Sequence, residues 1–175
     1  MFKGMFNKEP KKVINDEYKK WRQLVFQLKA GNVDVAGNDP GKVFGMIMDF
    51  GLTDRASGSH FWLSTAAFAN GDAEFRPTPG GGFSGLGTDA RVAAVAKELV
   101  SMAQIFKVKA KPVTEFPLPE VGRVAFYFLT NGGVLVTEDA LSAFQSGPYS
   151  QLLTKFGQIR GFAERLIDQR MAQKK

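Results

Sequence analysis

The chain has 175 residues, 44% of them apolar and 23% charged, which is typical of a single globular domain. It has no cysteine and one histidine, His60, which excludes disulfide frameworks, thiolate zinc sites, iron–sulfur clusters and multi-histidine metal sites. The net charge of +6 is concentrated at the ends: residues 1–30 carry eight Lys or Arg against three Asp or Glu, and residues 155–175 carry six against two. Basic ends are typical of contact with nucleic acid, anionic lipid or an acidic protein, and the favoured alternative is a helix face that is simply solvated.

A first helix is predicted from Glu9 to Ala30, because apolar residues recur there at spacings of four and three. This stripe consists of Ile14, Tyr18, Trp21, Val25 and Leu28. Four lysines off the stripe are the candidate partner-binding residues: Lys11, Lys12, Lys19 and Lys20. Ahead of the helix, Phe2, Met5 and Phe6 would form a short apolar anchor.

Three strands are predicted next, over Val43–Phe50, His60–Ala69 and Asp72–Thr78. The first is apolar on both faces, as in a strand covered on both sides. Its faces are Phe44, Met46, Met48 and Phe50 on one side and Val43, Gly45 and Ile47 on the other. Asn70-Gly71 is the residue pair of a tight hairpin turn, which predicts an antiparallel meander.

A second helix is predicted from Asp89 to Phe106, with Thr88 as its N-cap. The following segment, Lys107–Glu120, holds three prolines and is expected to be extended and irregular. A last helix is predicted from Pro148, a residue favoured in the first turn, to about Met171.

Between these two helices, a second Asn-Gly pair, Asn131-Gly132, predicts a hairpin that joins Arg123–Thr130 to Val134–Glu138. The order is therefore helix, three strands, helix, two strands, helix. It predicts a single α+β domain with one antiparallel sheet of about five strands and helices packed on it. The basic N-terminal segment would pack on the 43–171 body or extend from it.

The segment 80–88 is rich in glycine and leads from a strand into a helix. Backbone N–H groups at a helix start, with glycines that allow close approach, suit a phosphate or carboxylate group. The candidate ligand-binding residues are Gly80, Gly81, Gly82, Ser84, Gly85, Gly87, Thr88, Arg76 and Arg91. A structural or flexible turn is the favoured interpretation, because neither a Walker lysine nor a parallel βαβ unit follows and Asp89 would repel an anion.

No residue set in the sequence predicts catalysis. His60 follows a polar loop, but no nucleophile-elbow motif accompanies it, and Asp49-Phe50-Gly51 lacks the other kinase motifs. Two carboxylate pairs are typical of turns: Asp72 with Glu74, and Glu138 with Asp139. We therefore assign no catalytic residue, no metal ligand and no cofactor, and the residue types favour a protein that is not an enzyme.

Two glycines four residues apart, Gly157 and Gly161, lie inside the predicted last helix. Each costs about 1 kcal/mol relative to alanine, so the pair predicts close approach of another backbone. That backbone is the first helix of the same chain or the same helix of a second copy, in a homodimer.

Several short segments together resemble small bacterial proteins of unknown function, over about residues 43–138. These segments are Leu63-Ser64-Thr65, Gly80-Gly81-Gly82, Phe126-Tyr127-Phe128-Leu129-Thr130 and the following Asn-Gly-Gly. The resemblance implies a bacterial cytoplasmic origin and transfers neither an activity nor functional residues.

We expect a cytoplasmic protein, because the start lacks the apolar run of a secretory signal and no stretch reaches the 18 apolar residues of a membrane span. The favoured function is a non-catalytic protein-interaction or regulatory module. A ligand-binding protein or enzyme that uses residues 80–88 is the alternative. Nucleic-acid binding by the basic ends is a third interpretation, less favoured because the basic residues of the last helix spiral around it: Lys155, Arg160, Arg165 and Arg170.

Overall fold

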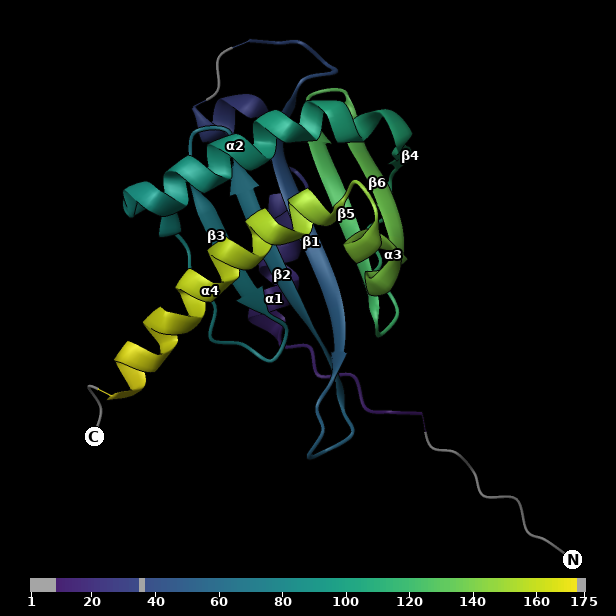
Figure 1. The fold of residues 1–175 in the computed structure, drawn as a ribbon, viewed down its shortest axis with the longest axis vertical. Helices are drawn as coiled ribbons and strands as arrows, with labels where there is room; N and C mark the ends of the chain where they lie inside the picture. Colours follow the sequence, from purple (N-terminus) through teal and green to yellow (C-terminus); the bar gives the residue numbers. More distant parts are fainter. Residues whose placement is uncertain (1–8, 35–36, 173–175) are drawn as a thin grey trace, which may run out of the picture.

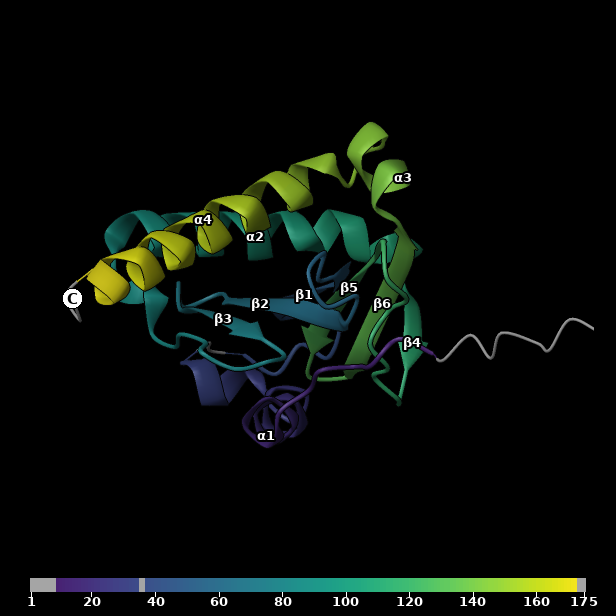
Figure 2. The same ribbon diagram turned by 90° about the horizontal axis from the view of Figure 1, so that it is seen from below.

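A computed structural model describes residues 9–34 and 37–172, and the predicted anchor at Phe2, Met5 and Phe6 lies outside this part. The described residues form one antiparallel sheet of six strands. Figure 1 shows the helices α2 and α4 crossing the near side of this sheet. Seen from below, α2 and α4 cover one face of the sheet and α1 lies against the other (Figure 2). The predicted α+β fold with a single antiparallel sheet is confirmed.

The strands lie in the order β3-β2-β1-β5-β6-β4. Their bounds are β1 Val43–Thr53, β2 His60–Phe68, β3 Ala73–Pro77, β4 Lys111–Val113, β5 Arg123–Thr130 and β6 Gly133–Ala140. The first three form the predicted meander, and β5 pairs with β6 in the second predicted hairpin.

The sixth strand, β4, lies in the segment that we expected to be irregular. Its three residues pair with β6, and Pro112 is opposite Leu135. A proline fits there because β4 is an edge strand, where a missing N–H group breaks no ladder on the outer side. The expected count of about five strands is corrected to six for this reason.

A β-bulge in β1 corrects the predicted faces of this strand. The register with β5 shifts after Val43, so one extra residue is accommodated and the alternation reverses. Phe44 therefore packs with Ile47 on the α1 face, whereas Met46 packs under α2 and α4.

The helices are α1 Asp16–Val25, α2 Ala90–Phe106, α3 Leu141–Ser146 and α4 Ser150–Ala172, with short 3-10 helices η1 Ala30–Val33, η2 Leu86–Thr88 and η3 Lys107–Lys109. The first helix is shorter than predicted at both ends and covers Asp16–Val25. Asn15 caps its start, where its Oδ1 accepts a hydrogen bond from Tyr18 N at 2.7 Å. The residues before the cap run extended, and Lys12 pairs with His60 at the start of β2.

Two further helix boundaries differ from the prediction. The N-cap of α2 is Asp89 rather than Thr88, since Asp89 Oδ1 accepts from Arg91 N at 2.9 Å. The last helix, α4, begins at Ser150 rather than at Pro148, and a short helix that was not predicted, α3, precedes it. In Figure 1, α4 runs beside α2 and its last turns project past β3.

Candidate functional site

The glycine-rich segment covers the free edge of β3. Phe83 N donates to Phe75 O at 2.7 Å, and Phe75 N donates to Phe83 O at 2.9 Å. Gly80 and Gly81 have φ of +117° and +80°, and a Cβ on Gly82 would collide with the Phe75 carbonyl. The glycines thus shape an edge cover, and the space between this segment and α1 is only about 10 Å³.

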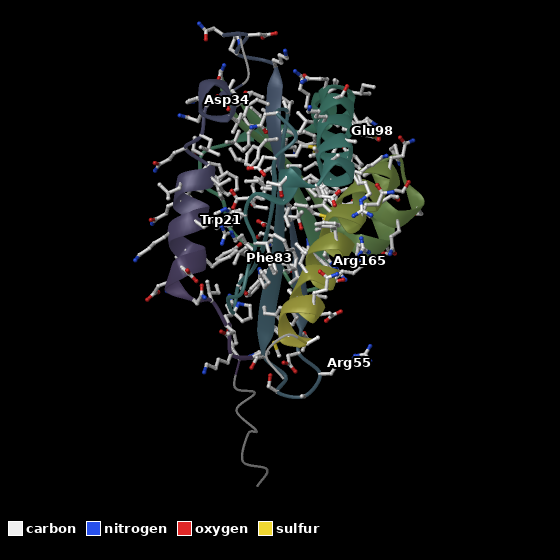
Figure 3. All side chains as sticks on the ribbon, turned by 90° about the vertical axis from the view of Figure 1, so that its left-hand side faces the viewer. Trp21, Asp34, Arg55, Phe83, Glu98 and Arg165 are labelled. Atoms are coloured by element: carbon white, nitrogen blue, oxygen red, sulfur yellow. The ribbon has the colours of Figure 1, made fainter. Side chains whose placement is uncertain are left out.

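Arg76 lies beside this segment, as expected, but it pairs with a carboxylate of its own strand. Its Nε and Nη2 donate to Glu74 Oε2 at 3.2 and 3.1 Å, and it also contacts the Ser84 hydroxyl. Trp21 Nε1 donates to the same Glu74 oxygen at 2.8 Å. Figure 3 shows Trp21 on the side of α1 that faces the sheet. This cluster joins α1 to the edge of the sheet.

The end of the segment leads into α2 through hydrogen bonds of its own. Gly85 has a φ of +67°, Thr88 Oγ1 donates to Gly85 O at 3.0 Å, and Gly87 N donates to Asp72 Oδ1 at 3.4 Å. These contacts fix the turn that starts the helix.

Arg91 is placed away from the rest of the predicted ligand set. Its Nη2 lies 2.8 Å from Asp89 Oδ2, and its guanidinium lies over the Phe162 ring of α4 at 5.6 Å. The hydrogen bond from Arg91 lowers the pKa of Asp89 to about 2. The structure thus brings Gly80–Gly82, Ser84 and Arg76 together and separates Arg91 from them, and ligand binding by this set stays a prediction.

The four candidate lysines lie on two elements. Lys11 and Lys12 belong to the extended segment before α1, and Lys19 and Lys20 project from α1 itself. All four are exposed, and Lys19 Nζ pairs with Asp16 at 2.9 Å. Their role in partner binding stays a prediction.

His60 lies at a separate cavity of about 570 Å³, lined also by Lys12, Trp62 and residues 117–121. The main chain of His60 bonds with the extended N-terminal segment: its N–H donates to Lys11 O and its carbonyl accepts from Val13 N. His60 therefore helps to hold that segment against β2.

The sequence did not indicate a network of four polar side chains between α1 and the sheet: Tyr18 and Arg22 of α1, Asp49 of β1 and Ser64 of β2. Asp49 of β1 has no exposed surface, and Ser64 Oγ donates to its Oδ1 at 2.5 Å. Since the Ser64 hydroxyl has one proton, the 2.7 Å contact with the Tyr18 hydroxyl requires Tyr18 to donate. Arg22 Nη1 donates to Tyr18 at 3.1 Å. A directed chain of hydrogen bonds therefore runs from Arg22 through Tyr18 and Ser64 to Asp49.

The charges of this network balance within it. Arg22 Nη2 lies 2.7 Å from Asp49 Oδ2, in an ion pair without hydrogen-bond alignment, and Arg22 Nε and Nη2 donate to Phe116 O. Burial and the charge of Asp49 raise the pKa values of Tyr18 and Tyr127, so both phenols are neutral. The network connects α1 to the sheet, and α1 covers it. Its role is therefore to hold α1 in place on the sheet.

A groove lies where α2 ends, beside β4 and the tip of the β5–β6 hairpin. It has a volume of about 600 Å³, and we call it the β4 groove. Its lining includes Gly41, Lys107, Val108, Val113, Gly132 and Leu135. Val108 is 81% exposed, and Ile105, three residues earlier on the same side of this helical end, is 75% exposed.

The two glycines of α4 do not meet another backbone within the described residues. A Cβ on Gly157 would have nothing within 4 Å, and one on Gly161 would reach only the end of the Arg165 side chain at 3.8 Å. The predicted contact with the first helix of the same chain is therefore wrong, because α1 lies on the opposite face of the sheet (Figure 2). Contact with a second copy stays a prediction.

Within residues 9–34 and 37–172, no group of three or more His, Asp or Glu side chains is placed to hold a metal ion. No helix in that part is long and apolar enough to cross a membrane. Comparisons of the chain with protein-family models, with curated proteins and with solved structures found no match. The resemblance to small bacterial proteins therefore stays a prediction.

Proposed function

We propose that this protein is a non-catalytic interaction module whose β4 groove binds an extended segment of a partner protein, apolar at its centre and acidic at its flanks. The observation that carries the proposal is the combination of a groove of about 600 Å³ with Val108, the most exposed large apolar residue of the described chain, at its margin.

The apolar part of the surface supports a protein partner. Val108 lines the groove together with Val113 and Leu135. Ile105, three residues earlier and outside the lining, leaves a second large aliphatic side chain in water. Single exposed apolar residues are ordinary, but adjacent ones beside a concave surface are typical of interaction sites. Burial of each side chain contributes about 1.5–3 kcal/mol, which favours binding.

The positive charge near the groove favours acidic residues on both sides of the apolar centre of the partner segment. Lys107, Lys109 and Lys111 alternate along the chain, with no acidic residue between them. Lys107 is held by Gln104 at 3.2 Å and by the carbonyl of Gly41, while Lys109 and Lys111 are exposed. Acidic residues beside an apolar centre would complement these lysines and speed the encounter.

The composition of β4 argues against binding of the partner segment as an added strand of the sheet. This strand has three residues, one of them Pro112, and both Lys111 and Pro112 are exposed. Short edge strands with lysine and proline are protected against the addition of another strand. Side-chain contacts in the groove, rather than backbone ladder bonds, would therefore hold the partner.

Arrays of short peptides test the proposal. One array places two or three apolar residues between Asp and Glu, and its matched array replaces these acids by Lys. We expect retention on the acidic array only, and a loss of about tenfold or more in affinity for Ile105→Glu combined with Val108→Glu. Leu24→Glu is the matched control, since Leu24 is an exposed apolar residue of α1.

Two results would contradict the proposal. Equal retention on both arrays would show that charge complementarity plays no part. Loss of binding in a variant with Lys11, Lys12, Lys19 and Lys20 changed to glutamine, with the groove variant unaffected, would place the partner on α1 and the segment before it.

A further inference from the structure

A second concave site lies under α4, on the same face of the sheet as α2. This α4 cavity has a volume of about 400 Å³, within the range of sites that hold small molecules. Met48, Phe50 and Val124 come from the sheet, and Leu141 and Leu153 come from α3 and α4. Five apolar side chains from four elements therefore give the cavity a preformed apolar wall.

Gly157 of α4 lines this cavity. A glycine inside a helix costs stability, and no close packing explains it here, because a Cβ would have nothing within 4 Å. Open space lies where a side chain would stand. The glycine thus leaves room on the side of the cavity formed by α4. Any larger residue at this position would reduce the volume of the cavity.

Polar groups gather on the rest of the lining. They are Gln145, Ser150, Thr154 and Arg160. The Arg160 side chain is 37% exposed, and only its Nε is used in the 2.8 Å pair with Glu164 on the next turn. The remaining N–H donors of its guanidinium suit the planar fork of a carboxylate.

We infer that the α4 cavity binds a small amphiphilic carboxylate, with its apolar chain against Met48, Phe50 and Val124 and its carboxylate at Arg160. This site is distinct from the β4 groove in its lining residues, and the inference does not rest on the proposed function. A carboxylate fits better than a neutral amphiphile because the one charged group of the lining is a cation.

Calorimetric titration with octanoate and decanoate tests the inference, with octanol as the uncharged probe. We expect saturable binding of both carboxylates below their micelle concentrations. Arg160→Gln should weaken carboxylate binding about tenfold and leave octanol binding unchanged. Gly157→Leu should abolish binding by filling the cavity.

Gly161→Ala is the matched control, since it also removes a glycine from α4 but lies outside the lining of the cavity. It should bind octanoate as the wild type does. The melting temperatures of all variants establish that they are folded, and Arg160→Gln keeps the test valid if Gly157→Leu does not fold.

The inference is overturned if the wild type binds neither carboxylate, or if Gly157→Leu binds octanoate unchanged. It is also overturned if light scattering shows a dimer that Gly157→Leu converts to a monomer, because a second copy would then cover this side of α4.

Discussion

Arg22 of α1 and Asp49 of β1 form an ion pair of 2.7 Å, in which the carboxylate has no exposed surface. The same two residues are the two ends of a hydrogen-bonded chain that runs from Arg22 through Tyr18 and Ser64 to Asp49. A buried charge is tolerated only with such partners, since its transfer from water is costly. The position of α1 on the sheet therefore depends on this pair as well as on apolar packing.

Arg22→Met should destabilise the protein more than Asp49→Asn does. Without Arg22, the Asp49 charge is buried and uncompensated, at a cost of about 3–5 kcal/mol. Without the Asp49 charge, Arg22 keeps its contacts with Phe116 O and Tyr18, so the cost is about 1–3 kcal/mol. Urea unfolding at neutral pH measures both values.

The double variant should cost less than the sum of the two single changes, because the residues are in direct contact. Glu138→Gln is a suitable reference, since its pair with Arg123 is part-exposed and is expected to contribute little to the free energy of unfolding. Additive effects of Arg22→Met and Asp49→Asn would contradict the described pairing.

The free energy of unfolding should fall at alkaline pH, because two tyrosines, Tyr18 and Tyr127, ionise less readily in the folded state than in the unfolded state. Burial, with the charge of Asp49, raises the pKa values of Tyr18 and Tyr127 above the ordinary 10.0. The folded state therefore keeps protons that the unfolded state releases, so this contribution is complete below about pH 10 and is lost as the pH rises further.

Unfolding free energies from about pH 9 to about pH 12 check this expectation. Tyr18→Phe and Tyr127→Phe should each reduce the negative slope above pH 10 by up to about 1.4 kcal/mol per pH unit. Unchanged slopes, or phenolate absorbance from both residues in the folded protein near pH 10, would show that these hydroxyls are open to water.

Gly82→Ala should lower the free energy of unfolding by about 1–3 kcal/mol, because its Cβ would collide with the Phe75 carbonyl in the edge cover of β3. Gly31→Ala in η1 is the control, with nothing within 4 Å of its Cβ and an expected effect between zero and a gain of about 1 kcal/mol. An unchanged melting temperature for Gly82→Ala would mean that the glycine-rich segment does not pack on the edge as described.

Much of the fold follows from local patterns in the sequence. The pairs Asn70-Gly71 and Asn131-Gly132 mark both hairpins in the sequence, although neither asparagine has the positive φ of a type I′ turn. The bulge after Val43 and the pairing of β4 depend on other strands, so no local pattern indicates them. A three-residue strand with a proline is especially hard to predict, because only its edge position permits it.

The buried network, the role of the glycine-rich segment and the grooves were harder to predict from the sequence than the fold was. An aspartate amid the apolar residues of β1 is a signal of a buried charge, but its partner Arg22 belongs to another element, and only the fold brings them together. The glycines at 80–88 have the same composition in a ligand loop and in an edge cover, and the contact between Phe75 and Phe83 distinguishes the two arrangements. Grooves arise from several elements and have no sequence pattern.

Gly157→Ala and Gly161→Ala should each raise the free energy of unfolding by about 1 kcal/mol, because alanine favours a helix and both sites have room for its Cβ. For a chain of this length the melting temperature would rise by about 2–4 °C. A lower melting temperature for either variant would indicate a backbone contact at this side of α4, as in a homodimer.

The most direct measurement of the proposed function is the backbone amide chemical-shift map on addition of the tightest peptide from the acidic array. We predict that shifted signals gather in residues 105–114 and 130–135, which surround the β4 groove. They should weaken with added salt as the lysines are screened. Shifts confined to the lysines of residues 11–20, or to the glycine-rich segment 80–88, would contradict the proposal and place the binding surface there.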